Sequence, residues 1–125
     1  MRKIISTDLA PAAVGPYSQA IQTSHSLFIS GQLPIDPQTN QLVEGSIADQ
    51  TRQVLQNILE ILRAADLDRS DLVKTTVYLR NMDDFAAVNE IYAAVFGQNP
   101  PARVCVEVSR LPKDALLEID AIACE

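Results

Sequence analysis

Alternation of apolar and polar residues near the C-terminus is the feature that most constrains the fold. Residues 102–108 and 117–123 place an apolar side chain at every second position, and residues 72–80 show the same pattern earlier in the chain. Because successive side chains of a strand point to opposite faces, each segment is predicted to be a strand. In the segment 102–108 the valines are expected to face a core, so that Arg103 and Cys105 point the other way.

Two other segments have the spacing of amphipathic helices. Residues 47–65 are predicted to form the first helix, with Ser46 as its N-cap and Asp49 in its first turn. Residues 83–96 are predicted to form the second helix, and Gly97 is placed to end it. The core face of the first helix consists of Val54, Ile58, Ile61, Leu62 and Ala65.

The remaining segments complete one α+β domain of 125 residues. A short strand is predicted at 2–5, and strands at 18–23 and 27–30 form a hairpin. Residues 36–40 and 111–114 are predicted turns. Two helices can cover only one face of the resulting sheet. The other face is partly apolar, so we expect a homo-oligomer.

The turn at 111–114 suggests that the last two strands pair as a hairpin. A register that sets Cys105 opposite Glu118 also sets Arg103 opposite Asp120, which would bring a guanidinium close to a carboxylate on the face away from the helices. That face would turn toward a neighbouring subunit. The residues alone favour an ordinary cross-strand ion pair, with a substrate-binding pair as the alternative.

Composition excludes several classes of function. The net charge of −6 argues against general nucleic-acid binding, which needs clustered basic residues. Cys105 and Cys124 fit neither a disulfide framework nor a zinc site, and the only histidine, His25, lies in a predicted turn, so that a catalytic cysteine is disfavoured. We find no secretory signal and no membrane-spanning segment, and we expect a cytoplasmic protein.

Several motifs in order resemble the RidA/YjgF family over essentially the whole chain. The longest is PARVCVEVSRLPKD at 101–114, followed by Leu117-Glu118-Ile119. Further matches lie at 13–20, 30–32, 73–77 and 84–89. One departure is the short segment 96–101, where many members have a longer loop with a large apolar residue, and it bears on the outer pocket wall.

The resemblance implies a chorismate-mutase-like fold with a mixed sheet, a homotrimer, and active sites in the clefts between subunits. It implies hydrolysis of 2-iminobutanoate and 2-iminopropanoate to 2-oxo acids and ammonia. In this family Arg103 would hold the substrate carboxylate and Glu118 would position water. The matching pocket positions are Tyr17, Ser30, Gly31, Asn89 and Cys105.

These residue types suit that chemistry. The forked guanidinium of Arg103 matches both oxygens of a carboxylate, and Glu118 can act as a general base toward water, so neither a metal nor an organic cofactor is expected. Two alternatives remain open: a trimer that binds or senses 2-oxo acids without turnover, and a stress-activated holdase. Ribonuclease activity, ascribed to some relatives, is disfavoured by the acidic balance.

Overall fold

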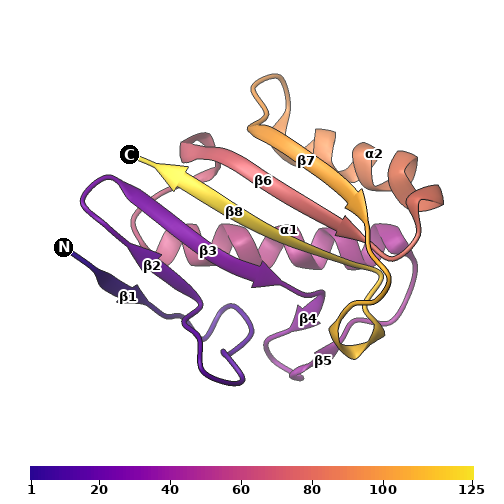
Figure 1. Cartoon of the computed structure of the whole chain (residues 1–125), viewed down its shortest axis with the longest axis horizontal. Coiled ribbons are helices and arrows are strands. Elements are labelled where there is room, and N and C mark those ends of the chain that lie inside the picture. Colours follow the sequence, from indigo (N-terminus) through magenta and orange to yellow (C-terminus); the bar gives the residue numbers. More distant parts are fainter.

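The computed structural model describes residues 1–125 as a six-stranded sheet with both helices behind it (Figure 1). In spatial order the strands are β1 (Lys3–Ile5), β2 (Ala20–Gln22), β3 (Ser26–Gln32), β8 (Leu117–Cys124), β6 (Leu72–Leu79) and β7 (Ala102–Glu107). A separate small sheet pairs β4 (Ile35–Asp36) with β5 (Gln41–Leu42). The helices are α1 (Ile47–Ala64) and α2 (Phe85–Phe96). Short 3₁₀ turns span Arg69–Asp71, Met82–Asp84 and Pro112–Asp114.

Helix α1 begins and packs as its sequence predicts. The Ser46 side chain accepts the backbone N–H of Asp49, and the Asp49 carboxylate accepts the N–H of Ser46, which forms a complete capping box. The predicted apolar face is buried in the core against β3 and β8. The helix also anchors the loop after β3, because the buried Asn57 amide donates to the carbonyls of Leu33 and Ile35.

Helix α2 ends at Gly97, whose φ of 62° lies in the region that favours glycine. It packs beside α1 on the same face of the sheet and buries Val88, Tyr92 and Phe96. The predicted arrangement of two helices on one face of a mixed sheet is therefore confirmed.

The predicted hairpin between the last two strands is wrong. Strand β7 pairs in parallel with β6, and β8 pairs antiparallel with the other side of β6, so that β6 separates the two strands (Figure 1). Parallel neighbours need a crossover connection, and α2 provides one between β6 and β7. Cys105 therefore lies opposite Val77, and Glu118 lies opposite Tyr78.

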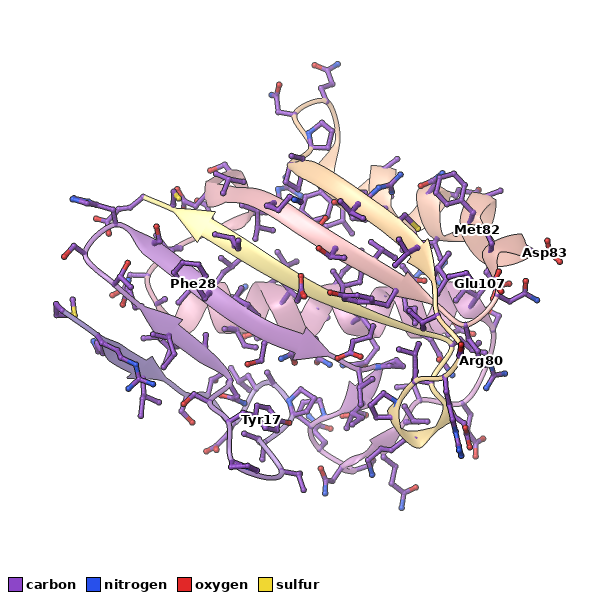
Figure 2. All side chains as sticks on the ribbon, in the orientation of Figure 1. Tyr17, Phe28, Arg80, Met82, Asp83 and Glu107 are labelled. Atoms are coloured by element: carbon purple, nitrogen blue, oxygen red, sulfur yellow. The ribbon has the colours of Figure 1, made fainter.

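The predicted orientation of β7 is also wrong. Cys105 packs against the core under α2, whereas Val104 and Val106 lie on the uncovered face, 43% and 37% exposed. Because β7 is an edge strand beneath a single helix, its polar side can reach the helix and its apolar side is left bare. The uncovered face also carries Phe28, which is 48% exposed (Figure 2).

Strand β3 contains a β-bulge. The β2–β3 hairpin is regular, but the register between β3 and β8 shifts between Ile29 and Gln32. Ser30 and Gly31 occupy this irregularity, beside the middle of β8. Bulges redirect side chains and are common next to active sites.

Candidate functional site

Glu118 lies on the uncovered face of β8, next to Gly31. Its neighbours Leu117 and Ile119 are fully buried on the helix face, which fixes the opposite direction for Glu118. The Glu118 carboxylate occupies the space where a Cβ on residue 31 would stand, so a side chain at this position would overlap it. Glycine at position 31 is thus required by the close approach of the carboxylate, rather than by a turn.

The environment raises the pKa of Glu118 above its ordinary value. Burial is the larger cause, because it disfavours the charged carboxylate, and the negative charge of Asp120 adds to it. A carboxylate with a raised pKa is a stronger proton acceptor than an ordinary surface glutamate.

A cavity of about 550 Å³ opens beside this carboxylate. Four of the residues predicted for the site, Tyr17, Ser30, Gly31 and Glu118, line it together. Lys113, from the turn before β8, adds a cationic side chain to its wall. The structure therefore brings together residues that are separated by about a hundred positions in the sequence.

Hydrogen bonds from Gln19 and Ser30 hold the loop at residues 7–18, which forms one wall of the cavity. The amide of Gln19, which is 4% exposed, donates to the carbonyls of Thr7, Ala10 and Pro11 and accepts the N–H of Thr7. The Ser30 hydroxyl donates to the carbonyl of Ser18 at 2.6 Å. The sequence analysis did not single out Gln19. Its buried amide is bonded to backbone groups of the loop, as buried polar groups generally must be.

Tyr17 lies in the same loop and is 51% exposed (Figure 2). Its hydroxyl accepts the N–H of Val14 at 3.3 Å. The ring thus folds back over the turn at Gly15 and forms part of the cavity wall.

Arg103 lies on the other face of the sheet, against α2. Its guanidinium is 4.9 Å from the centre of the Tyr92 ring and 5.5 Å from that of Phe85, and one of its NH₂ groups donates to the Asn89 side chain at 2.7 Å. The Tyr92 hydroxyl is in turn hydrogen-bonded to Thr75 at 2.7 Å. These contacts fix the guanidinium plane, and cation–π contacts stabilise its charge.

No carboxylate of the chain pairs with Arg103. The ion pairs are Arg52–Asp49, Arg63–Glu60 and Arg110–Asp114. A half-buried guanidinium with donors left over is suited to bind an external anion. The simpler reading of Arg103 as a cross-strand ion pair within the chain is therefore wrong.

A hollow of about 460 Å³ lies in front of this guanidinium. Its walls come from α2 and from the short segment after it, namely Asn89, Tyr92, Ala93, Phe96, Gly97, Pro100 and Pro101. The segment 96–101, singled out above as shorter than in many relatives, thus forms the outer wall of the Arg103 hollow.

The structure does not bring Arg103 and Glu118 together within one chain, so the predicted intrachain juxtaposition is wrong. Arg103 and Cys105 share the helix face with Asn89, while Glu118, Gly31 and Ser30 belong to the cavity on the uncovered face. The predicted site residues thus form two half-sites, one around Arg103 and one around Glu118.

Cys105 has the environment of a packing residue. Burial raises the pKa of its thiol, and the nearby Arg103 only partly opposes this. Both cysteines are free thiols. The lone histidine, His25, lies in the turn between β2 and β3, where its backbone carbonyl accepts the N–H of Glu125.

Two further polar residues lie on the uncovered face: Tyr78, which the sequence analysis did not single out, and Asp120, which it placed opposite Arg103. The Tyr78 hydroxyl donates to the Asp120 carboxylate at 2.9 Å, and this hydrogen bond is the main cause that raises the pKa of Tyr78. The alternation of β6 and β8 already placed both residues on the face of Glu118. Only the register shows that they are its neighbours.

The chain has no cluster of three or more His, Cys, Asp or Glu side chains arranged to hold a metal ion. No helix combines the length and the apolar character needed to cross a membrane.

Residues 7–125 match the family described as endoribonuclease L-PSP. A RutC family protein of Pyrococcus horikoshii is 59% identical to the chain, over 98% of both sequences. The human 2-iminobutanoate/2-iminopropanoate deaminase is 47% identical over 100% of this chain and 91% of its own length. Escherichia coli TdcF with bound serine superposes with a TM-score of 0.95 at 44% identity and 98% coverage of each chain.

Proposed function

We propose that this chain, which belongs to the RidA/YjgF family, hydrolyses small 2-imino acids such as 2-iminobutanoate and 2-iminopropanoate to 2-oxo acids and ammonia. The observation that carries the proposal is the half-buried Arg103, held by two aromatic rings and Asn89, which lacks a carboxylate partner. A small carboxylic acid would supply that partner. The name of the human relative and the serine bound to TdcF are compatible with such a ligand.

In this proposal the active site is completed by two subunits of a homotrimer. The Arg103 half-site and the Glu118 half-site lie on opposite faces of the sheet, so one chain cannot apply both to one small substrate. The bare stripe of β7, with Val104 and Val106, and the apolar residues around Phe28 supply a surface for association. We further propose that the protein works in the cytoplasm, where its two free thiols would stay reduced.

The reaction would use Arg103 of one subunit and Glu118 of its neighbour. The guanidinium binds the substrate carboxylate and places the imine carbon at the Glu118 cavity. Glu118 accepts a proton from water as the water oxygen bonds to the imine carbon, and the imine nitrogen takes up a proton. As the resulting aminoalcohol collapses, Glu118 returns its proton to the nitrogen, the C–N bond breaks and ammonia leaves. The hydroxyl proton passes to solvent, which balances the proton taken up by the imine nitrogen, and the 2-oxo acid is released. No redox step is involved.

The direct test generates the imine in place. Threonine or serine dehydratase releases 2-iminobutanoate or 2-iminopropanoate, and semicarbazide traps what remains unhydrolysed. We expect the purified protein to lower the yield of trapped imine and to speed formation of the 2-oxo acid. Tight binding of 2-oxobutanoate with no change in trapping would instead select a 2-oxo acid sensor, and cleavage of added RNA would reopen the ribonuclease alternative.

Replacing Gly31 by alanine should strongly reduce turnover. The new Cβ would overlap the Glu118 carboxylate and push it from its place beside the cavity, and a shift of about 1 Å can cost on the order of a hundredfold in rate. The rate of imine hydrolysis by the folded variant measures this effect.

Gly45→Ala is the matched control for this variant. A Cβ at position 45 would likewise displace a carboxylate, that of Asp49, but this carboxylate caps α1 and does not line the cavity. We expect Gly45→Ala to lower the free energy of unfolding by about 1 kcal/mol and to leave turnover unchanged. Full activity in Gly31→Ala would contradict the role given to the Glu118 position.

A further inference from the structure

Tyr78, Glu118 and Asp120 form a cluster on the uncovered face of the sheet. The register pairs Tyr78 directly with Glu118, whereas Asp120 lies opposite Thr76. Directly paired residues have Cβ atoms about 4.5–5.5 Å apart, and aromatic side chains also reach diagonal neighbours. The Tyr78 hydroxyl donates to its diagonal neighbour Asp120 at 2.9 Å, and not to Glu118, with which Tyr78 is directly paired.

Because of this hydrogen bond, Tyr78 does not act as a donor to the Glu118 carboxylate. The Tyr78 hydroxyl bonds Asp120 instead, and none of the ion pairs of the chain involves Glu118, whose side chain borders the cavity and lies against Gly31. A carboxylate that already accepted the Tyr78 hydroxyl would be a weaker acceptor, because a bonded donor stabilises its charged form. The direction of the Tyr78 hydroxyl therefore determines whether the Glu118 carboxylate can accept a proton from water without a competing donor.

We propose that Asp120 is a positioning residue: by accepting the Tyr78 hydroxyl, it keeps this donor away from Glu118 and leaves both Glu118 oxygens available to the attacking water. The inference rests on the deaminase function proposed above, and it assigns a role in that reaction to a residue that touches neither substrate nor water.

The negative charge of Asp120 also makes the Glu118 carboxylate a stronger proton acceptor. Asp120 on the same strand adds to the effect of burial in raising the pKa of Glu118. The other titratable groups that face Glu118 are Tyr78 from β6, and Tyr17 and Lys113 from the two loops that line the cavity. In the assembled site Arg103 of a neighbouring subunit would face it as well. Only Asp120 both carries a negative charge and holds the tyrosine hydroxyl.

The test is a rescue experiment. In Asp120→Ala the Tyr78 hydroxyl loses its acceptor, and Glu118 becomes the carboxylate across the strand pair. We expect kcat for imine hydrolysis to fall by about tenfold or more, the effect of one hydrogen bond to a charged group. The Kd for 2-oxobutanoate, which depends on Arg103, should remain at the wild-type value. The double variant Tyr78→Phe/Asp120→Ala lacks the competing donor and should recover most of the lost kcat.

A purely structural role for Asp120 would give a different pattern, because removing a second residue does not repair a damaged fold. Equal losses in the single and double variants would overturn the inference, and so would full activity in Asp120→Ala. Where Asp120→Ala fails to assemble, Asp120→Val carries the same two expectations, since it also lacks an acceptor and suits a strand. Asp83→Asn removes a negative charge in the 3₁₀ turn before α2, which does not line the cavity (Figure 2), and should leave kcat unchanged.

The two proposals fail in distinguishable ways. Loss of activity in Glu118→Gln together with normal kcat in Asp120→Ala would overturn only the role of Asp120. A wild-type protein that does not hydrolyse imines, or a fully active Glu118→Gln variant, would overturn both.

Discussion

Mixed trimers of Arg103→Ala and Glu118→Gln subunits should regain about a quarter of the wild-type rate, although each variant alone is nearly inactive. In a cyclic trimer each site would take Arg103 from one subunit and Glu118 from the next, so random mixing leaves about one site in four with both residues intact. The two residues lie on opposite faces of the chain, which is the geometry that makes this complementation possible. The measurement is the imine hydrolysis rate after the two variants are unfolded together and refolded.

The parent variants set the baseline for this experiment. Arg103→Ala removes charged hydrogen bonds to the substrate worth about 1.5–3 kcal/mol each, or about tenfold or more in kcat/KM for each bond. Wild-type protein taken through the same unfolding and refolding measures the recovery of folded trimers. A mixture no more active than the sum of its parents would mean that the two residues do not share a site across an interface.

Glu118→Gln should lower kcat by about a hundredfold or more while leaving the affinity for 2-oxobutanoate intact. The amide keeps the shape of the side chain but cannot accept a proton from water, and general base catalysis contributes about 10²–10⁴ in rate. Arg103→Ala should instead weaken the binding of the same 2-oxo acid, because it removes the group that holds the carboxylate. Isothermal titration alongside steady-state kinetics separates the two effects.

Glu118 should also determine how kcat/KM depends on pH. Since burial and Asp120 raise the pKa of Glu118, the base is lost as the pH falls through that raised value, and kcat/KM should fall on the acid side. In Asp120→Asn the nearby negative charge is absent, so the acid limb should move to lower pH. A limb that stays in place in Asp120→Asn would mean that another group controls it.

The local parts of the fold could be predicted from the sequence because they depend on near neighbours. The N-cap at Ser46 and the glycine that ends α2 at Gly97 are set within a few residues, and both predictions were confirmed. The pairing of β7 with β6 is set by a crossover through α2, and it was missed because two strands joined by a short turn were assumed to pair. The order strand, helix, strand over residues 72–107 contained the better signal, since it is typical of parallel neighbours.

The family motifs supplied the candidate site residues, but the sequence did not predict how they are arranged in space. Alternation along β7 gives two faces without saying which one α2 covers, so Arg103 was assigned to the wrong side. The role of Gly31 as the residue that makes room for Glu118 depends on a bulge that no local pattern announces. The Tyr78–Asp120 hydrogen bond depends in the same way on a register between strands about forty residues apart.

The exposed valines of β7 should make the thermal stability of the protein depend on its concentration. Val104 and Val106 are exposed in the single chain, and in the proposed homotrimer the native form would gain apolar burial that a lone chain lacks. Mass action then stabilises the native form more as the solution becomes more concentrated. A melting temperature that rises on concentrating the sample, and that loses this dependence in Val104→Lys, would be the calorimetric mark of that stripe.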